Sequence, residues 1–351
     1  MTTTDFSSAG ANAPTNVVLA VENLHVEFAM PDGTNVRAVN GVSYQLNSGE
    51  TLAIVGESGS GKSVTALSVL GLLRGGTIKR GKIIINGNDV LEMDPVERRK
   101  LLGSEIASIF QNPTSALNPL MKVGDQIVET LLVKNRDLTK REARKRVFSL
   151  LSAVGVPEPE VRANSFPHQF SGGMCQRVVI AIAIANEPRI LIADEPTTAV
   201  DVTIQAQLLD LIEMAKLETG ASTVLITHDL GVVAQAADRV AVMYGGRIVE
   251  YGDVFDIFER PSHPYTGALL GSMPRIDEDV ENLEVIPGQP PDMTDLPVGC
   301  AFQPRCAVGK GRVLCGTTIP DYSNLPSGQG VACHYPLGEG IPPSLGDNQN
   351  A

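Results

Sequence analysis

The feature that most constrains the fold is residues 56–63, which carry the pattern G-x-x-x-x-G-K-S. A short apolar stretch at residues 51–55 precedes the pattern and an apolar segment follows it, so it lies between an expected strand and an expected helix. In that position glycines let backbone N–H groups turn toward one anion, and the helix adds its positive N-terminal end. A chance glycine-rich turn is the alternative, but eight positions in this context favour a phosphate-binding loop.

The side chains of this loop have separate expected roles. Lys62 supplies positive charge to the β- and γ-phosphates, and Ser63 offers a hydroxyl to Mg²⁺. The full expected nucleotide-binding set of the loop is Gly56, Ser58, Gly59, Ser60, Gly61, Lys62, Ser63 and Val64. The loop therefore predicts a nucleoside triphosphate and Mg²⁺ as ligands.

A second apolar stretch, residues 190–193, ends in two adjacent carboxylates, Asp194 and Glu195. An acid at a strand end beside a phosphate loop can hold Mg²⁺, usually through water, which is the role expected for Asp194. Glu195 is then expected to polarise the water that attacks the γ-phosphate. A solvated acidic turn is the alternative, which the run of apolar residues before both acids argues against.

Two further polar residues follow predicted strands. His228 comes after residues 223–227, and we expect it to contact the γ-phosphate and orient the water at the carboxyl edge of the sheet. A structural histidine is the alternative, and the strand-end position favours the catalytic role. Gln111, which follows residues 107–110, is expected to coordinate Mg²⁺ and to sense the γ-phosphate.

Apolar patterning organises the rest of the chain. Residues 1–16 are polar and rich in Ser, Thr and Ala, so we expect them to be disordered. Strands and helices then alternate around a mostly helical section, residues 112–170, which predicts an α/β fold with a helical insertion. A hairpin is expected at Gly245 and Gly246. Past about residue 261 proline and glycine become frequent and periodicity fades, which predicts a separate, loop-rich appendage.

Composition argues against several classes of protein. The chain has 351 residues and a formal net charge of −12, and an acidic chain repels phosphate backbones, so no nucleic acid is expected as a partner. Its start lacks the basic and apolar blocks of a secretory signal, and no stretch approaches the ~20 apolar residues needed to span a bilayer. We therefore expect a protein that is cytosolic or attached to a membrane through partners.

Residues 171–177 read Ser-Gly-Gly-Met-Cys-Gln-Arg and resemble the signature loop of ABC-transporter ATPases. The order of motifs resembles the ABC nucleotide-binding domain over about residues 17–265: phosphate loop, Gln111, Ser171-Gly172-Gly173, Asp194-Glu195, Asp201 and His228. The resemblance implies an α/β fold, a P-loop NTPase of the ABC ATPase type. Its expected parts are a RecA-like core sheet, an antiparallel β subdomain and a helical subdomain at about residues 112–180.

The resemblance also implies how the signature loop is used. A glycine-led helix start is an anion site of its own. In this family Ser171, Gly172 and Gly173 clamp the ATP that is bound to a partner subunit, so two domains hold two ATP molecules head to tail. ATP closes the pair and hydrolysis lets it reopen. Asp201 is expected to cross the same interface.

One position departs from the family pattern, and the residue that stacks on adenine has more than one candidate. Met174 stands where Gln is commonest after the two glycines, which changes that side chain but leaves the backbone donors. Phe28 corresponds to an aromatic residue that stacks on adenine in many members of the family. A place in the strand core is an equal alternative for Phe28, and Arg37 is a second candidate for stacking on the base.

Three segments near the C-terminus resemble the extension of oligopeptide and dipeptide importer ATPases: residues 260–270, 286–291 and 299–306. Nickel importers of the same group are close relatives. The resemblance implies an ATPase motor for peptide import at the cytoplasmic face of the cell membrane. The implied partners are a second ABC ATPase in a heterodimer, two permeases and an extracytoplasmic binding protein. Residues 113–132 are expected to face the permeases.

Two other classes of ABC protein remain as alternatives. A soluble ABC ATPase of DNA repair or translation usually carries coiled-coil arms or a second cassette, and this sequence has neither. A degenerate subunit that binds ATP without hydrolysing it is the other alternative. Glu195 and His228 argue against it, because both expected catalytic positions are filled.

The last expected domain, residues 266–351, contains four cysteines at the spacing C-x5-C-x8-C-x17-C: Cys300, Cys306, Cys315 and Cys333. Four thiolates suit an iron–sulfur cluster or a structural zinc, but the spacing is not that of a C-x2-C zinc ribbon. The resemblance implies a [4Fe–4S] cluster, with four reduced cysteines packed in a small domain as an equal alternative. Cys175, inside the signature helix, is expected to be a packing residue.

Overall fold

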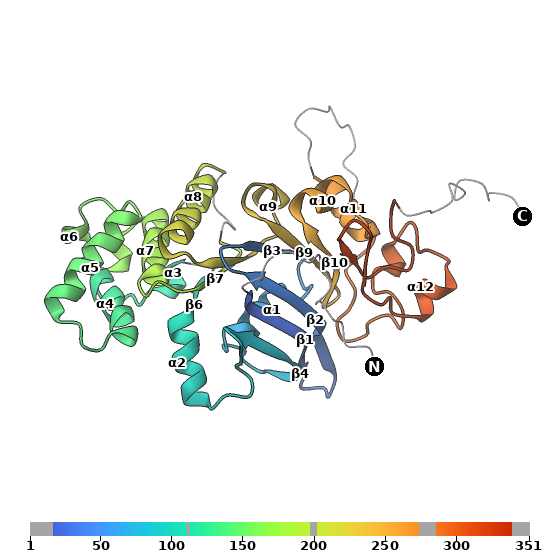
Figure 1. Ribbon diagram of the computed structural model, residues 1–351, viewed down its shortest axis with the longest axis horizontal. Helices are drawn as coiled ribbons and strands as arrows, with labels where there is room; N and C mark the ends of the chain where they lie inside the picture. Colours follow the sequence, from blue (N-terminus) through green and yellow to red (C-terminus); the bar gives the residue numbers. More distant parts are fainter. Residues whose placement is uncertain (1–16, 111–112, 197–201, 274–285, 339–351) are drawn as a thin grey trace, which may run out of the picture.

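The computed structural model describes residues 17–110, 113–196, 202–273 and 286–338, which form two sheets and the helices around them (Figure 1). Gln111 and Asp201, two of the residues assigned to the nucleotide site, lie outside the described residues. The expected N-terminal tail lies outside them as well.

The larger sheet has eight strands in the order β11-β12-β10-β9-β3-β8-β7-β6. Neighbours from β9 to β6 run parallel. Every residue of β3 and β8 is buried, which explains why apolar residues make up most of both strands, because a parallel strand is covered on both faces. The strands are β3 Thr51–Val55, β6 Ile106–Ile109, β7 Ile190–Asp194, β8 Ser222–Ile226, β9 Arg239–Tyr244, β10 Arg247–Asp253, β11 Ser323–Asn324 and β12 Gly330–Val331.

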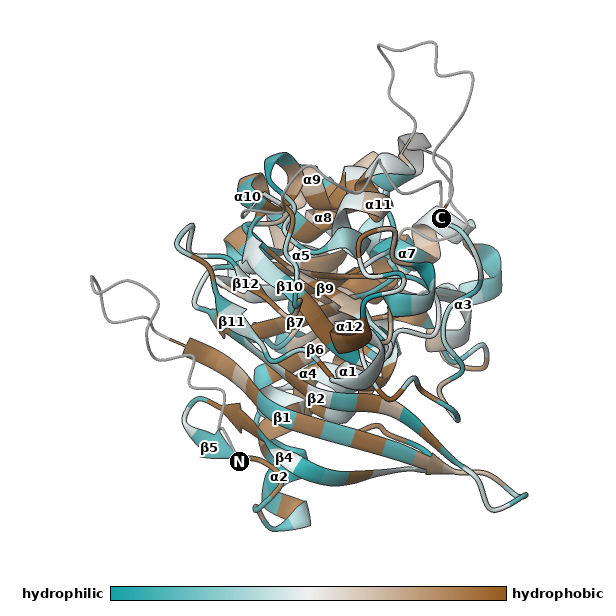
Figure 2. Ribbon diagram, turned by 90° about the vertical axis from the view of Figure 1, so that its right-hand side faces the viewer, coloured by the Kyte–Doolittle hydropathy of each residue, from teal (hydrophilic) through white to brown (hydrophobic). Residues whose placement is uncertain are grey.

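The smaller sheet is antiparallel, with its strands in the order β2-β1-β4-β5. Its apolar face shares one hydrophobic core with helix α1 (Lys62–Val69) and the larger sheet, through residues such as Val21, Val69 and Ile54. In Figure 2, long stretches of the strands in both sheets carry the colour of hydrophobic residues. The strands are β1 Val17–Ala29, β2 Asn35–Asn47, β4 Gly76–Ile85 and β5 Asn88–Asp89.

The predicted helical section forms the end of the molecule at the left of Figure 1. Its core contains Val178, Ile180 and Ala181 of helix α7, none of them measurably exposed. A capping box between Thr139 and Glu142 starts helix α5. The helices of this section are α3 Pro113–Ala116, α4 Val123–Lys134, α5 Lys140–Ala153, α6 Pro159–Arg162, η2 Pro167–Gln169 and α7 Gly172–Ile184. Helix α2 (Pro95–Glu105) precedes the section and lies below β6 in Figure 1.

Helix α8 and the hairpin follow their sequence patterns. Helix α8 (Val202–Thr219) buries Leu208, Leu211, Ile212 and Ala215 on one face, because these apolar residues recur at helical spacing. Tyr244 pairs with Arg247 across Gly245 and Gly246, whose φ angles are 53° and 77°, so the predicted hairpin is confirmed. The helices that follow are α9 Leu230–Ala236, α10 Val254–Glu259 and α11 Pro264–Gly271.

The C-terminal segment is poor in regular structure, as predicted, and one of its short strands pairs with the larger sheet. It contains η3 (Gln303–Arg305), α12 (Val313–Thr317) and the two short strands β11 and β12. Strand β12 pairs with β10, so the segment extends the larger sheet. No helix in the described part of the chain is both long and apolar enough to cross a membrane.

Candidate nucleotide-binding site

The phosphate-binding loop leaves the end of β3 and leads into α1, as the sequence predicts. Gly56 and Gly61 have φ angles of 150° and 100°. A Cβ on Gly56 would lie 2.1 Å from the carbonyl oxygen of Met243, and a Cβ on Gly61 would lie 2.3 Å from that of Ala38. Glycine is therefore required at both positions, because the backbones of β9 and β2 pass directly against the loop.

Lys62 begins helix α1 and is 5% exposed. Its Nζ donates hydrogen bonds to the carbonyl oxygens of Gly56 at 2.7 Å and Glu57 at 3.0 Å. Burial lowers the pKa of Lys62, and the nearby carboxylates of Glu195 and Asp194 oppose that shift. The ammonium group is thus held inside the loop, where a phosphate oxygen is a stronger acceptor than a carbonyl.

The remaining loop residues divide between surface and interior. Ser58 and Gly59 are exposed, and Gly59 has a φ of 80°. Ser60 is buried, and its Oγ has no hydrogen-bond partner in the described residues. Val64 packs against the core shared by α1 and the two sheets. The crest of the loop, which would meet the phosphates, is the part that faces solvent.

Two of the three expected magnesium ligands, Ser63 and Asp194, meet in the structure. Ser63 Oγ donates a hydrogen bond to Asp194 Oδ1 at 3.0 Å, which joins the start of α1 to the end of β7. Burial raises the pKa of Asp194 and the adjacent Glu195 adds to the rise, while Ser63 and Lys62 lower it. A hydroxyl beside a carboxylate is an oxygen donor set of the kind that Mg²⁺ takes together with phosphate and water.

Glu195 and His228 also meet, at the ends of neighbouring strands β7 and β8. Glu195 has a φ of 47°, and its backbone N–H donates to the carbonyl oxygen of Ile226 at 2.8 Å. His228 Nδ1 lies 3.5 Å from Glu195 Oε1. The carboxylate is mostly buried and the imidazole is mostly exposed, so the pair stands at the rim of the sheet where a water molecule can reach it.

The signature loop forms the exposed start of helix α7. Ser171 caps the helix by accepting a hydrogen bond from the backbone N–H of Met174 at 3.3 Å. A Cβ on Gly172 or Gly173 would meet nothing within 4 Å, so open space lies in front of the helix. No hydrogen bond of the described residues joins Ser171, Gly172 or Gly173 to the phosphate-binding loop. In the described residues the space in front of the helix start is therefore open.

One buried amide near the site has no counterpart in the sequence predictions. Gln176, in the same helix, is 5% exposed, and its Nε2 donates to the carbonyl oxygen of Pro196 at 2.7 Å. This bond ties the signature helix to the residue that follows Glu195. A buried polar side chain within an apolar helix is a usable sequence signal, because such a group needs a partner.

The adenine candidates occupy different surroundings. Phe28 packs against the core of the smaller sheet, and its ring covers Gly76, where a Cβ would come 2.8 Å from Cζ. Arg37 is exposed, with its Nε 4.0 Å from Glu27 Oε1. The structure therefore places Phe28 in a packing position and Arg37 at the surface.

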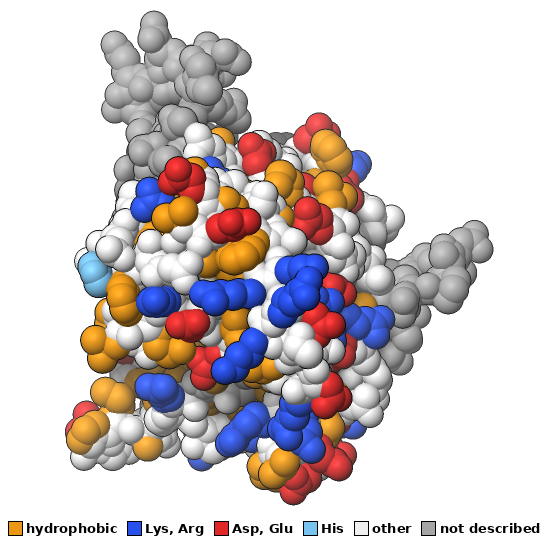
Figure 3. Space-filling model, turned by 90° about the vertical axis from the view of Figure 1, so that its left-hand side faces the viewer, with side chains coloured by type: hydrophobic (Ala, Val, Ile, Leu, Met, Phe, Trp, Pro, Cys, Tyr) orange, Lys and Arg blue, Asp and Glu red, His pale blue; other side chains and the backbone are white. Residues whose placement is uncertain are grey.

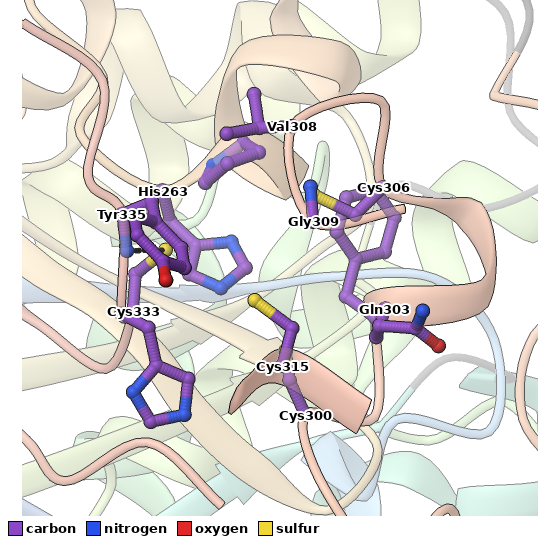
Figure 4. Close-up of a pocket in the computed structure, with 12 residues that line it drawn as sticks. His263, Cys300, Gln303, Cys306, Val308, Gly309, Cys315, Cys333 and Tyr335 are labelled. Carbon is purple, nitrogen blue, oxygen red and sulfur yellow. Dashed lines mark hydrogen bonds between the residues drawn. The ribbon is translucent and has the colours of Figure 1, made fainter. Parts of the chain in front are cut away.

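The four C-terminal cysteines line one small cavity together with His263 (Figure 4). Backbone N–H groups point at two of the sulfurs: Gly309 N lies 3.1 Å from Cys306 Sγ, and Tyr335 N lies 3.4 Å from Cys333 Sγ. Burial raises the pKa of all four thiols, that of Cys333 to about 12. In the described residues no group of three or more His, Cys, Asp or Glu side chains is arranged to hold a metal ion.

Cys175 is separate from this cavity. It is 1% exposed, and its Sγ contacts the carbonyl oxygen of Pro167 at 3.6 Å. The structure places it in the core of the helical section, as expected for a packing residue.

Comparisons with known proteins agree with this geometry. The family described as ABC transporter matches residues 39–198, and the family described as oligopeptide/dipeptide transporter, C-terminal region, matches residues 249–312. The dipeptide transport ATP-binding protein DppD of Bacillus subtilis is 51% identical over 318 residues, which cover 90% of this chain and 94% of that protein. The oligopeptide transport ATP-binding protein OppD of Salmonella typhimurium is 46% identical over 329 residues, with coverage of 94% and 97%.

Solved structures give the same fold. The ATP-binding cassette MJ0796, a dimer in a post-hydrolysis state bound to ADP and Pi, is 29% identical, with a TM-score of 0.60 over 67% of this chain and 98% of its own. CbiO1 of Clostridium perfringens, part of an ABC transporter complex, is 30% identical, with a TM-score of 0.59 over 70% and 92%. The chain belongs to the ABC-transporter ATP-binding proteins, in the family that includes the dipeptide and oligopeptide transport ATP-binding proteins.

Proposed function

We propose that this chain is the ATP-hydrolysing motor subunit of an importer for dipeptides or oligopeptides. The observation that carries the proposal is that Ser63 meets Asp194 and His228 meets Glu195 at one edge of the larger sheet. Relatives that are 46% to 53% identical and are named for dipeptide and oligopeptide transport support the class of cargo. A nickel importer of the same group is the alternative cargo assignment.

Each residue of the site then has a role in hydrolysis. Backbone N–H groups of residues 56–63 and the ammonium of Lys62 hold the β- and γ-phosphates. Ser63, and Asp194 through water, hold Mg²⁺, which neutralises phosphate charge when bound. Glu195 accepts a proton from the attacking water.

Three further residues complete the proposed chemistry. His228 stands beside Glu195 and contacts the γ-phosphate, which keeps the water in line. Gln111 is proposed as a further Mg²⁺ ligand, and Asp201 as a residue of the interface between subunits. Either Phe28 or Arg37 contacts the adenine.

The open start of helix α7 is the proposed contact with ATP bound to a second ABC ATPase subunit. Because Ser171, Gly172 and Gly173 make no hydrogen bond to the phosphate-binding loop in the described residues, we assign them to the ATP of a second ABC ATPase. That assignment makes two composite sites, and the dimeric relative bound to ADP and Pi supports it. ATP then acts as the bridge that closes the pair, and loss of the γ-phosphate weakens it.

The helical end of the molecule is the proposed contact with two permeases at the cytoplasmic face of the membrane. Residues 113–132 include Leu120, which is 85% exposed, and Val133 directly after them is 60% exposed. Figure 3 shows hydrophobic and basic side chains side by side on this end of the molecule. Exposed apolar side chains within a charged surface are typical of protein contacts. An extracytoplasmic binding protein would supply the cargo.

Reconstitution tests the proposal. The chain, its partner ATPase, the permeases and the binding protein are placed in vesicles, and ATP hydrolysis and uptake of labelled di- and oligopeptides are measured. We expect ATP-dependent peptide uptake. Uptake of Ni²⁺ without uptake of any peptide would contradict the cargo assignment.

Leu120→Asp tests the permease contact in the same vesicles. A charge in the middle of an apolar contact should lower peptide uptake about tenfold while the isolated chain still binds ATP. Val161→Asp is the matched control, because Val161 is 61% exposed on helix α6, outside residues 113–132. Normal uptake by Leu120→Asp would exclude this segment as the contact.

We also propose that Cys300, Cys306, Cys315 and Cys333 hold a [4Fe–4S] cluster in a C-terminal domain, residues 266–351, that follows the ATP-binding domain, residues 17–265. The proposal rests on the type and number of the donors, because four thiols line one cavity and backbone N–H groups point at two of the sulfurs. Binding would draw the four sulfurs into a set that they do not form in this structure. Such a centre would cross-link a segment that has little regular structure.

A further inference from the structure

The C-terminal segment contacts the phosphate-binding loop directly through Arg305. Its Nη1 lies 2.6 Å from Glu57 Oε2 and its Nη2 lies 3.0 Å from Glu57 Oε1, so the pair is bidentate. The Arg305 side chain is 6% exposed and that of Glu57 is 23% exposed. Two parallel hydrogen bonds in a largely buried setting fix both the distance and the direction of the contact.

The contact is joined to the rest of the loop through the backbone of Glu57. Its N–H donates to Tyr265 Oη at 2.9 Å, and its carbonyl oxygen accepts the hydrogen bond from Lys62 Nζ at 3.0 Å. The C-terminal half of the chain therefore holds Glu57 by its side chain and by its N–H. The carbonyl oxygen of Glu57 in turn holds Lys62, the lysine assigned to the phosphates.

Arg305 itself is firmly placed. Its Nε donates to the carbonyl oxygen of Pro287 at 2.9 Å, and its Nη1 also donates to Tyr244 Oη at 3.2 Å. Phe302, in the same turn, packs its ring 5.2 Å from that of Tyr244 and 5.3 Å from that of Tyr265, measured between centroids. Arg305 also lies directly before Cys306, so the cysteine-lined cavity and the loop are joined by one short stretch of chain.

The charge of Glu57 makes the arginine important for an anionic ligand. A carboxylate in the second position of a phosphate-binding loop repels a triphosphate, because both are negative. Arg305 neutralises that carboxylate and holds it toward the C-terminal segment. Removing the guanidinium would leave a partly buried, unpaired carboxylate beside the site and free the loop to move.

We propose that Arg305 is a positioning residue for ATP: it acts through Glu57 to hold the phosphate-binding loop in shape, so that the cysteine-bearing segment controls the affinity of the site for nucleotide. The inference rests on the proposed assignment of residues 56–63 as the ATP site.

A double-mutant cycle on the full-length chain tests the inference, with Mg²⁺–ATP binding measured by calorimetry. Arg305→Gln should raise the Kd for Mg²⁺–ATP about tenfold. In a Glu57→Gln background the same substitution should change the Kd by less than about twofold, because the carboxylate that Arg305 restrains is gone. Equal effects of Arg305→Gln in both backgrounds would overturn the inference, since they would mean that Arg305 acts by another route.

Steady-state kinetics of the assembled transporter give a readout that a general loss of folding would not produce. Arg305→Gln should raise the KM for ATP about tenfold and leave kcat within about twofold, because the residues that activate the water are untouched. A fall in kcat with unchanged KM would contradict a role in positioning the loop.

If Arg305→Gln does not fold, Arg305→Lys replaces it. Lysine keeps the charge but not the bidentate geometry, so a smaller rise in the Kd for Mg²⁺–ATP is expected, and no rise would overturn the inference.

Arg312→Gln is the matched control. Arg312 belongs to the same segment, donates to the carbonyl oxygen of Val308 at 2.9 Å and covers the ring of Tyr335 at 4.1 Å from its centroid. The Kd for Mg²⁺–ATP should stay unchanged in this variant, and a rise equal to that of Arg305→Gln would overturn the specific route through Glu57. Lys62→Ala distinguishes a failure of the ATP-site assignment from a failure of the inference about Arg305. If Lys62→Ala leaves ATP binding intact, the assignment of residues 56–63 as the ATP site fails. If Lys62→Ala weakens ATP binding and Arg305→Gln does not, only the inference about Arg305 fails.

Discussion

At the scale of single residues, Asp194 lowers the stability of the fold when it is ionised, although the proposed Mg²⁺ site needs its carboxylate. Burial and the neighbouring Glu195 raise the pKa of this carboxyl group above its ordinary value. The folded chain therefore holds the proton more tightly than the unfolded chain does. Stability contributed by this group falls as pH rises from the ordinary pKa through the raised one, and the cost persists at neutral pH. A site that receives Mg²⁺ accepts this cost, because the cation offsets the charge.

Asp194→Asn removes that cost and keeps an acceptor for Ser63. Without nucleotide, we expect the Tm of the variant at neutral pH to exceed that of the original chain by about 2 °C. The difference should shrink as pH falls toward the ordinary pKa of an aspartate. Hydrolysis of ATP should meanwhile fall about 100-fold, because the Mg²⁺ site is lost.

Thermal denaturation across a pH series checks this expectation. Asp253→Asn is the control, since Asp253 caps helix α10 at the surface and Asn caps equally well. Its Tm should match that of the original chain. A lower Tm for Asp194→Asn at neutral pH would contradict the expectation, because it would mean that ionised Asp194 stabilises the fold.

At the scale of elements, the start of helix α7 carries the claim that a second subunit supplies part of each site. Ser171→Arg adds a long side chain where open space now lies in front of the helix. We expect the Kd of the isolated chain for ATP to stay within about twofold, while hydrolysis by the assembled pair falls at least about tenfold. Calorimetry on the isolated chain and turnover by the complex measure the two quantities. Parallel loss of both would contradict a site completed in trans.

Elements that owe their form to local sequence were predictable. A few residues were enough to predict β3, β7 and β8 from their apolar runs and the phosphate-binding loop from its glycines. These elements bring Ser63, Asp194, Glu195 and His228 to one edge of the sheet. Contacts that depend on how distant elements pack were not predictable. The sequence can indicate that Gln176 needs a partner and that Phe28 can pack in a strand core. That the partners are Pro196 and Gly76 is fixed by helix rotation and strand register, which no short pattern encodes.

At the scale of the whole molecule, the C-terminal segment is joined to the larger sheet by the pairing of β12 with β10. Proline and glycine content predicted its loops correctly. Its docking was missed, because the two-residue strand β12 has no periodicity to detect. The aromatic cluster of Tyr244, Tyr265 and Phe302 also joins β9, helix α11 and the C-terminal segment.

The cysteine cavity gives a prediction at the same scale. Chain purified without oxygen should contain about four iron atoms and as many acid-labile sulfides, with visible absorption from iron–thiolate bonds. Cys315→Ser should lose the iron, whereas Cys175→Ser, which changes a cysteine outside the cavity, should keep it. One zinc ion per chain, or four reduced thiols without metal, would contradict the cluster.

The central claim is that Glu195 activates water at an ATP site built on the phosphate-binding loop, and Glu195→Gln tests it most directly. Glutamine keeps the shape and the hydrogen-bonding capacity of the side chain but does not take up a proton as a carboxylate does. We expect the variant to bind Mg²⁺–ATP at least as tightly as the original chain, while kcat of the assembled transporter falls by about 100-fold or more. Turnover within a few-fold of normal in this variant would contradict the claim.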